Sequence, residues 1–370
     1  MGKDALSTMN KGNHPRHISI GTFYETALGP DFVGSEYEKA RDLRYGTNPS
    51  QTAALYNSNS FLGSLQELRT GKEGPSQTNF EDIFYAAITL GYFNASSAII
   101  MKHENPSGFA TQYTDEPLAR IYAKAFDADF RAAFGGTVML NRPVDHDTAS
   151  EIRRLFTEVV VAPDFDEGVV GSFTGSTRIY KYDDERFKSI PRYTGDNAVP
   201  EIKRLPDGSV IVADPLVTPI RSLDDLRQYI KSERQPTERE LQDLLTGYRI
   251  RLRSNSIRMV KDGYTTGIGT GQMDRVNCIN IAAFKNQDLN TLAAAEGRAR
   301  AANYDIAGSC LISDGFFPFS DSIDRAHELG IPAVLAPHGG VKFNDVLAKV
   351  NEYGMAFVDL LGNLRFFDHH

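Results

Sequence analysis

The stretch Ala98-Ile99-Ile100-Met101-Lys102-His103-Glu104-Asn105-Pro106-Ser107-Gly108 sets the pattern from which the rest of the chain can be interpreted. Its four apolar residues predict a buried strand, and Asn-Pro-Ser-Gly predicts the turn after it. Lys102 and His103 lie at the strand end. Histidine is suited to moving a proton near neutral pH, and a neighbouring lysine can supply charge or a second proton. The alternative is a structural Lys-His pair with its polar groups in water.

Helical and strand patterns alternate on both sides of this stretch. Apolar residues from Phe80 to Leu90 recur at helical spacing, and Asn79 is a suitable N-cap. Further on we expect a helix over 118–125, a strand at 137–140, a helix near 152–156 and a strand at 159–162. Short buried strands that alternate with helices indicate an α/β fold. No clear internal sequence repeat is visible.

The second half of the chain repeats this alternation. Residues 1–35 are polar and irregular, although 18–21 could pair as a strand. Residues 164–235 are rich in Asp, Arg, Pro and Gly, with a short strand at 209–212, and we expect them to join two domains. Thr237-x-x-Glu240 is a capping box that begins a helix. The strands expected after it are 256–260, 264–268, 309–313, 333–336 and 356–360, and the helices are 275–285, 290–303, 320–329 and 343–353. The predicted domains are an N-terminal extension (1–36), a first α/β unit with its connecting segment (37–235) and a second α/β unit (236–370).

Composition narrows the possible locations and ligands. The 370 residues carry a net charge of −8, which argues against general nucleic-acid binding. The sequence has no apolar stretch of about 18 residues and no apolar signal core at its start. Cys278 and Cys310 lie in apolar contexts without zinc-ligand spacing, which favours a reducing compartment and a cytoplasmic location. An anionic ligand would have to be met by local cations, for which the candidates are Arg44, Lys102, Arg275 and Arg365.

Further segments accompany the Lys-His stretch in a fixed order. They are Leu43-Arg44-Tyr45-Gly46-Thr47-Asn48-Pro49-Ser50-Gln51, Ser254-Asn255-Ser256, Gly267-Ile268-Gly269-Thr270-Gly271-Gln272-Met273-Asp274-Arg275, Ser313-Asp314-Gly315-Phe316-Phe317-Pro318-Phe319-Ser320-Asp321 and Leu364-Arg365-Phe366-Phe367-Asp368-His369-His370. Together they resemble the AICAR transformylase domain of the bifunctional purine biosynthesis enzyme, which joins AICAR transformylase to IMP cyclohydrolase. The resemblance runs from about residue 43 to the last residue.

The resemblance implies a fold, a reaction and partners. The fold would be two tandem cytidine-deaminase-like α/β units packed together, without the zinc signature of the deaminases. The reaction would transfer the formyl group of the co-substrate 10-formyltetrahydrofolate to the 5-amino group of AICAR, giving formyl-AICAR in de novo purine biosynthesis. We expect a homodimer with active sites at its interface. The resemblance implies no redox cofactor and no catalytic metal, and it is compatible with a structural potassium ion.

Three residues would carry the chemistry by this resemblance. The AICAR amine is a poor nucleophile, so it needs a base as it attacks, and the folate nitrogen needs a proton to leave. His103 would take the proton, and Lys102 would support or protonate the leaving side. Asn255 would hydrogen-bond the formyl group where an oxyanion develops. The alternative for Asn255 is a turn residue in Ser-Asn-Ser.

The remaining site residues would bind the two substrates. The nucleotide-binding positions are Arg44, Tyr45, Gly135, Glu158, Arg275, Phe316 and Arg365. The folate-binding positions are Phe134, Phe317, Pro318, Asp321 and His338. The guanidinium groups suit a phosphate, and aromatic faces can stack on an imidazole or pterin ring. Alternatives are surface ion pairs for the arginines, an ordinary strand-edge charge for Glu158, core packing for Phe316 and Phe317, and a helix-start role for Asp321. Lys261-Asp262-Gly263 predicts a hairpin turn, and we interpret the glycines from Gly267 to Gly271 as a tight strand-to-helix passage.

The chain departs from the family in places, and these departures leave alternatives open. Only a short segment precedes Leu43, so we expect no IMP cyclohydrolase activity and a separate cyclohydrolase acting downstream. Ser50, Ser107 and Asp368 differ from the family motifs, so the acceptor could be a different amino-imidazole or amine. Formate could replace the folate donor, but no P-loop supports ATP use. A non-catalytic nucleotide-binding regulator is the other alternative, and it would not need Lys102, His103 and Asn255 together.

Overall fold

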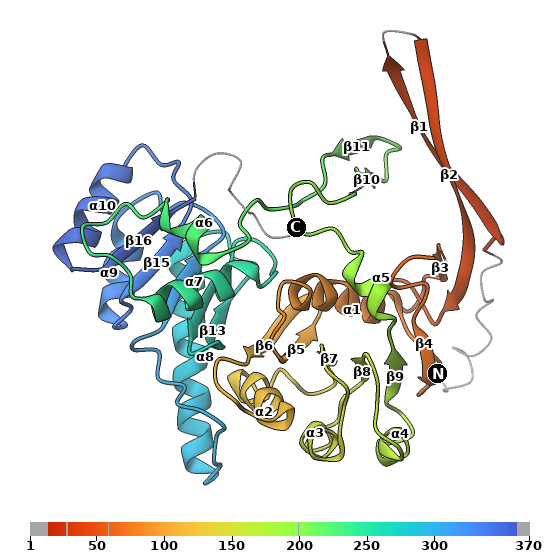
Figure 1. Ribbon diagram of the computed structural model, residues 1–370, viewed down its shortest axis with the longest axis horizontal. Helices are drawn as coiled ribbons and strands as arrows, with labels where there is room; N and C mark the ends of the chain where they lie inside the picture. Colours follow the sequence, from red (N-terminus) through yellow and green to blue (C-terminus); the bar gives the residue numbers. More distant parts are fainter. Residues whose placement is uncertain (1–13, 27–28, 58, 199, 361–370) are drawn as a thin grey trace.

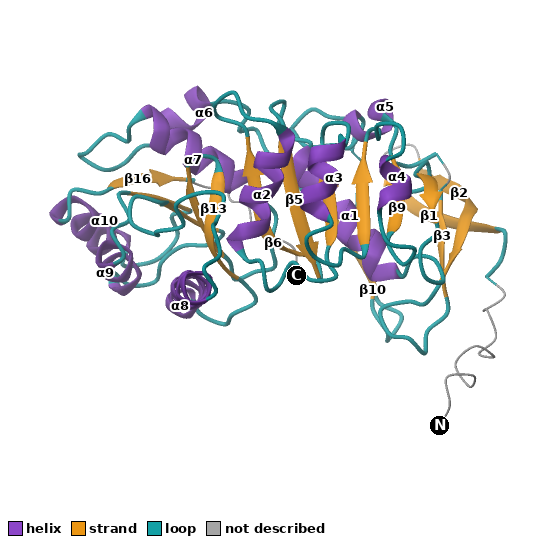
Figure 2. Ribbon diagram, turned by 90° about the horizontal axis from the view of Figure 1, so that it is seen from below, coloured by secondary structure: helices purple, strands orange, loops and turns teal. Residues whose placement is uncertain are grey.

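A large mixed sheet forms the body of the protein. The computed structural model describes residues 14–26, 29–57, 59–198 and 200–360 (Figure 1). The sheet has 11 strands in the order β16-β15-β14-β12-β13-β6-β5-β7-β8-β9-β4, and it runs through the whole body in Figure 2. Its strands are β4 (Gln66–Arg69), β5 (Ser97–Lys102), β6 (Asn105–Thr111), β7 (Thr137–Leu140), β8 (Val159–Ala162), β9 (Arg178–Lys181), β12 (Ile257–Lys261), β13 (Tyr264–Gly269), β14 (Cys310–Ser313), β15 (Ala333–Ala336) and β16 (Ala356–Asp359).

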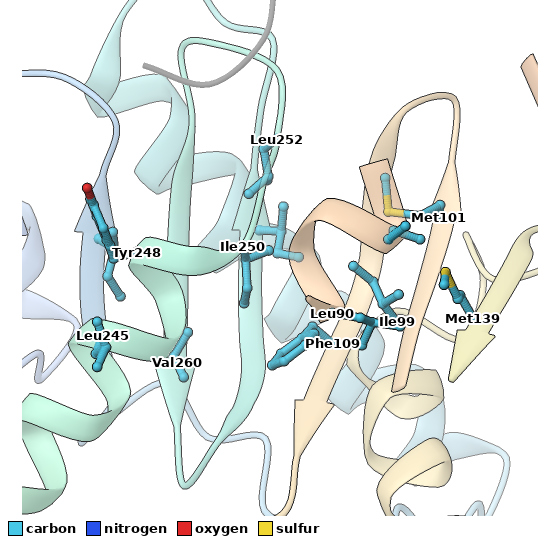
Figure 3. Close-up of a cluster of buried hydrophobic side chains, with 14 of the residues drawn as sticks. Leu90, Ile99, Met101, Phe109, Met139, Leu245, Tyr248, Ile250, Leu252 and Val260 are labelled. Carbon is cyan, nitrogen blue, oxygen red and sulfur yellow. The ribbon is translucent and has the colours of Figure 1, made fainter. Parts of the chain in front are cut away.

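Helices cover both faces of this sheet because side chains alternate along each strand. Ile99 and Met101 belong to one core cluster, whereas Ala98 and Ile100 belong to another. The cluster of Ile99 spans both halves of the sheet (Figure 3). That face carries α1 (Gln77–Leu90), α5 (Asp184–Lys188), α6 (Leu223–Arg227) and α7 (Glu238–Arg249). The opposite face carries α2 (Leu118–Ala128), α3 (His146–Ile152), α4 (Val169–Ser172), α8 (Arg275–Ala295), α9 (Asp321–Glu328) and α10 (Phe343–Glu352).

The same pattern of strand pairing occurs twice. In the first unit β5 pairs antiparallel with β6 and β7, and β7, β8 and β9 are parallel. In the second unit β12 pairs antiparallel with β13 and β14, and β14, β15 and β16 are parallel. The two units meet where β13 pairs antiparallel with β6. The α/β fold class is therefore confirmed, whereas the likeness of each unit to a cytidine deaminase and the domain boundaries stay predictions.

The turn predicted at Asn105-Pro106-Ser107-Gly108 is wrong. These residues begin β6, and the turn is His103-Glu104, because Lys102 pairs with Asn105 across it. His103 and Glu104 have φ angles of 54° and 64°, as in the two-residue turns that match the twist of a hairpin. Pro106 is tolerated in the strand because the register shifts there, so the missing N–H interrupts an irregular part of the ladder.

Two further predictions need correction. The two helices expected over 275–285 and 290–303 are the single helix α8, which ends because Gly297 takes a φ of 62° and accommodates a left-handed helix end. The irregular N-terminal segment contains β1 (His17–Thr26) and β2 (Gly29–Leu43), which pair as a long hairpin that projects from the body (Figure 1). Strand β2 also pairs with β3 (Ala53–Tyr56).

The predicted joining segment contains a second small hairpin. Strands β10 (Glu201–Arg204) and β11 (Val210–Ala213) form a separate two-stranded sheet, in agreement with the strand expected at 209–212. Gly267 and Gly269 lie within β13, whereas Gly271, with a φ of 68°, lies between β13 and α8, so the predicted strand-to-helix passage is confirmed for Gly271 and not for the other two glycines. Among the described residues, none of the helices is long and apolar enough to cross a membrane.

Candidate functional site

Lys102 is held by the loop that precedes β7. Its Nζ donates hydrogen bonds to the carbonyl oxygens of Phe134 at 3.0 Å and Gly135 at 2.8 Å. Gly135 has a φ of 63°, and an added Cβ would lie 3.2 Å from Nζ, so glycine lets this loop turn its carbonyls towards the ammonium group. Phe134 is 57% exposed, and its ring contacts the ring of Phe156 with centroids 5.7 Å apart. Three predicted site residues, Lys102, Phe134 and Gly135, are therefore in direct contact.

The turn that carries His103 also reaches the second unit. The Asn105 Oδ1 atom accepts hydrogen bonds from the backbone N–H of Arg253 at 2.9 Å and from the Thr270 hydroxyl at 3.1 Å. The Glu104 carboxylate pairs with the Arg253 guanidinium at 3.2 Å. The His103 ring is exposed, and none of the described residues makes a hydrogen bond or ion pair with it. The turn thus presents a free imidazole at the junction of the two units.

Asn255 lies in the second-unit loop that these contacts reach. Its Nδ2 donates one hydrogen bond to the carbonyl oxygen of Gln272 at 2.8 Å. An amide nitrogen carries two hydrogens, so a second one is left for a ligand. The neighbouring residues are fixed by the buried Asp314, which accepts hydrogen bonds from the Ser256 N–H at 3.0 Å and from the Ser254 hydroxyl. The hydrogen bonds of Ser254 and Ser256 therefore fix the position of Asn255, and one N–H of its side-chain amide remains available to a ligand.

Arg275 is largely buried beneath this loop. Its guanidinium is 10% exposed and lies 3.4 Å from the carboxylate of Asp314, which is fully buried. Gly315 leaves room for that guanidinium, since an added Cβ would lie 1.5 Å from its Nη2 atom. Phe316 is partly buried next to Gly340, whereas Phe317 is 4% exposed and belongs to the core cluster of the second unit. Phe317 thus takes the core position that was the alternative for one of these rings.

The predicted nucleotide residues of the first unit lie around residues 71–75. Arg44 pairs with Glu73 at 3.0 Å, and its guanidinium lies 5.1 Å from the ring centroid of Tyr45. The carbonyl oxygen of Tyr45 accepts a hydrogen bond from the N–H that starts α1. Glu158 pairs at 2.9 Å with Arg178, which is 2% exposed and also donates to the carbonyl oxygens of residues 72 and 74. Arg44 therefore contacts this loop directly, Glu158 is linked to it through Arg178, and Tyr45 contacts the first residue of α1, which follows the loop.

The predicted folate residues of the second unit lie farther along the sheet. The Nδ1 atom of His338 lies 3.3 Å from the buried carboxylate of Asp359, and burial raises the pKa of Asp359 above its usual value. Pro318 and Asp321 are exposed, and Asp321 accepts a hydrogen bond from the N–H of Ser322 in the first turn of α9. Arg365, together with the rest of the terminal motif, lies outside the described residues.

A buried carboxylate that the sequence patterns did not indicate lies under the hairpin. Asp82 of α1 is 4% exposed, and its Oδ1 atom accepts a hydrogen bond from the N–H of Glu104 at 2.7 Å. Burial raises the pKa of Asp82 to about 7, while Lys102 lowers it. The sequence contains one signal for Asp82, which is its spacing from the helix cap. Asp82 lies six residues after the N-cap Ser76, and Asp243 lies six residues after the N-cap Thr237.

The described residues contain no candidate metal site. Within the described parts of the chain, no three or more His, Cys, Asp or Glu side chains gather in a way that could hold a metal ion. The structural potassium ion stays a prediction without an assigned place. A buried positive charge is present next to the Asn255 loop, because Arg258 donates to the Ile250 carbonyl at 3.0 Å and to the Ser256 hydroxyl at 3.1 Å.

Comparison with known proteins adds an independent finding. The family described as AICARFT/IMPCHase bienzyme matches residues 18–285. Similar proteins include the bifunctional purine biosynthesis protein PurH of Persephonella marina, which is 34% identical over 346 residues, or 92% of this chain and 61% of the relative. The PurH proteins of Chlorobaculum parvum and Parvibaculum lavamentivorans are each 35% identical, over 92% and 95% of this chain and 61% and 63% of the relative. The chain thus spans less than two thirds of the length of these relatives.

A solved structure is also similar over part of the chain, but only weakly. It is described as a formate dehydrogenase accessory protein from Desulfotalea psychrophila, and it covers 46% of this chain and 99% of its own. The TM-score is 0.22 and the identity is 7%, which is too low to bear on the fold or the site.

Proposed function

The chain belongs to the AICARFT/IMPCHase bienzyme family, and on that premise we propose that it transfers the formyl group of 10-formyltetrahydrofolate to the 5-amino group of AICAR. The observation that carries the proposal is the meeting of two elements. The turn with Lys102 and His103 contacts the loop with Asn255 through Asn105 and Arg253. This contact between the two elements supports a site in which a proton acceptor, a cation and an amide donor act on one substrate.

The amine nitrogen of AICAR attacks the formyl carbon, and the bond between that carbon and N10 of the folate then breaks. His103 takes the proton that the attacking amine loses, which suits an exposed imidazole with no partner among the described residues. Lys102 supports the leaving nitrogen with a proton. Two of its ammonium hydrogens are directed at the carbonyls of Phe134 and Gly135, so the third remains for the substrate. Asn255 donates its second amide hydrogen to the oxyanion.

The proton balance of this scheme closes. His103 gains one proton and Lys102 gives one, so the pair returns to its starting state by exchange with solvent. The products are formyl-AICAR and tetrahydrofolate. The formyl group is transferred without oxidation or reduction, so no redox partner takes part. The binding side would be formed by Arg44, Tyr45 and Glu158 around residues 71–75 and by Phe134 beside Lys102.

We further propose a cytoplasmic homodimer with the active site at the interface of its copies, as the family resemblance implies. The exposure of the Phe134 ring next to Lys102 supports this, because an aromatic side chain at a reaction site is normally covered by substrate or by a partner. Size-exclusion chromatography with light scattering tests the assembly. A monomer with full formyl-transfer activity would contradict it.

The function is tested by incubating the purified chain with AICAR and 10-formyltetrahydrofolate while tetrahydrofolate release is followed. Mass spectrometry of the product distinguishes formyl-AICAR from IMP. We expect formyl-AICAR at a rate proportional to protein concentration. A protein that binds AICAR but releases no tetrahydrofolate would favour the nucleotide-binding regulator. Turnover with another amine in place of AICAR would favour a different acceptor.

A further inference from the structure

The turn that presents His103 is built from residues that do not favour its backbone. His103 and Glu104 both have positive φ angles, at 54° and 64°, and neither is glycine. A side chain with a Cβ atom is disfavoured in this region, so the surrounding structure has to hold such a turn in place. Asn and Gly are the residues that adopt this turn most readily, and the sequence has neither at these two positions.

A buried carboxylate contacts this turn from below. The Oδ1 atom of Asp82 accepts the Glu104 N–H at 2.7 Å, and its Oδ2 atom lies 3.4 Å from the Thr137 hydroxyl of β7. Helix α1 is fixed at its start by a capping box between Ser76 and Asn79, so it brings Asp82 under the turn at a defined place. The charged groups that face this carboxylate are Lys102 and Glu104 of the hairpin.

The second unit contains the same arrangement without a histidine. Asp243 of α7 accepts the N–H of Asp262 at 3.0 Å and the N–H of Gly263 at 2.9 Å. Those two residues form the equivalent turn, between Lys261 and Tyr264, with φ angles of 52° and 79°. Asp243 is 3% exposed and is therefore buried to the same degree as Asp82, which is 4% exposed. The fold therefore uses a helix aspartate under the hairpin turn twice, and only the first turn carries an imidazole.

We propose that Asp82 is a positioning residue of the reaction: by holding the Glu104 N–H it fixes the His103-Glu104 turn and with it the direction of the His103 imidazole. The inference rests on the proposed function, because it assigns His103 to proton transfer. Asp82 is buried and touches no substrate in this scheme. It acts through the backbone of the turn, and displacing a reacting group by about 1 Å can lower a rate by about 100-fold.

The experiment compares Asp82→Asn with its matched control Asp243→Asn in the full chain, at a pH above the pKa of the Asp82 carboxyl. Asparagine keeps the size of the side chain but replaces a charged acceptor by a neutral one, which forms a weaker hydrogen bond to the turn. We expect Asp82→Asn to lower kcat for formyl transfer by about 10-fold, with the Kd for AICAR unchanged within about 2-fold. Asp243→Asn weakens the hydrogen bonds to two N–H groups of the second turn and should leave kcat within about 2-fold of the wild type.

A second variant separates positioning from general destabilisation. Glycine suits a positive φ angle, so Glu104→Gly should make the turn less dependent on Asp82. Adding Asp82→Asn to Glu104→Gly should therefore lower kcat less than adding it to the wild type. Equal losses in both backgrounds, or equal kcat losses in Asp82→Asn and Asp243→Asn, would overturn the inference. A wild-type kcat in Asp82→Asn would also overturn it.

Amide hydrogen exchange tests the role of Asp82 in the turn separately from the proposed formyl transfer. Exchange of a peptide that covers residues 103–104 should be faster in Asp82→Asn than in the wild type, with or without AICAR. A wild type that does not turn over, yet shows this difference in exchange, would refute formyl transfer and retain the role of Asp82 in the turn. Exchange that is unchanged in Asp82→Asn would refute that role even if the wild type is fully active.

Discussion

Replacing Lys102 by methionine separates the chemical role of this lysine from its structural role, because the fold contains a matched control. Lys102 Nζ donates to the carbonyls of Phe134 and Gly135 at 3.0 and 2.8 Å. Lys261 Nζ, at the equivalent strand end of the second unit, donates to the carbonyls of Asp305 and Ala307 at 3.2 and 2.9 Å. Methionine keeps the length of the side chain and removes the ammonium group in either case.

The two substitutions should lower stability by similar amounts. Each removes two hydrogen bonds from a charged donor that is partly exposed, so we expect a loss of about 1–2 kcal/mol in the free energy of unfolding for each variant. Only Lys102→Met should affect turnover. A group that supplies a proton in the transition state typically contributes about 100-fold or more, so kcat should fall by at least that factor.

The assay combines urea unfolding with the tetrahydrofolate-release assay on both variants. Lys261→Met should retain kcat within about 2-fold, which shows that the loss of stability alone does not lower turnover. The reasoning fails if Lys102→Met is folded and turns over at the wild-type rate. It also fails if both variants lose activity equally, because Lys102 would then act through the fold alone.

Three further predictions concern other parts of the molecule. Asn255→Ala should lower kcat by about 100-fold while the Kd for AICAR changes little, because the amide serves the oxyanion; a change in Kd alone, seen by calorimetry, would contradict this. Gly108→Ala should lower the free energy of unfolding by about 2–3 kcal/mol, because the new Cβ would lie 1.9 Å from the Ala125 carbonyl oxygen, whereas Gly171→Ala, with open space around its Cβ, should be nearly neutral in urea unfolding. Burial raises the pKa of Asp82 from 3.8 to about 7, so the folded state favours the protonated form. The stability of the wild type relative to Asp82→Asn should therefore be greatest below pH 3.8 and fall as the pH rises to about 7, and a flat difference in urea unfolding would refute this.

The layers of the fold were predictable because they depend on local patterns. Apolar runs such as 98–101 and 159–162 became strands, and the capping box at Thr237 began α7. The hairpin turn was not predictable in the same way. Asn105-Pro106-Ser107-Gly108 has the composition of a turn, but the pairing of Lys102 with Asn105 and the contact of Asp82 with Glu104 place the turn at His103-Glu104. Tertiary contacts overrode the local preference there.

The candidate site residues could be named from the sequence, but the contacts between the elements that carry them could not. The residue types at Lys102, His103 and Asn255, together with the family resemblance, are enough to indicate proton transfer and oxyanion stabilisation. The contact between the His103 turn and the Asn255 loop depends on Asn105 and Arg253, which are ordinary polar residues with no signal in the sequence. Asp82 was missed for a related reason, since one aspartate on an amphipathic helix is unremarkable until the second unit shows Asp243 at the same place.

The most direct test of formyl transfer follows an isotope from donor to acceptor. The wild type and His103→Ala are each incubated with AICAR and 10-formyltetrahydrofolate labelled with carbon-13 in the formyl group, and the AICAR-derived product is identified by mass spectrometry. We predict that the wild type places the label on AICAR, while His103→Ala binds AICAR with wild-type affinity and transfers the label at least about 100-fold more slowly. Release of tetrahydrofolate with the label in free formate, or full transfer by His103→Ala, would contradict the account.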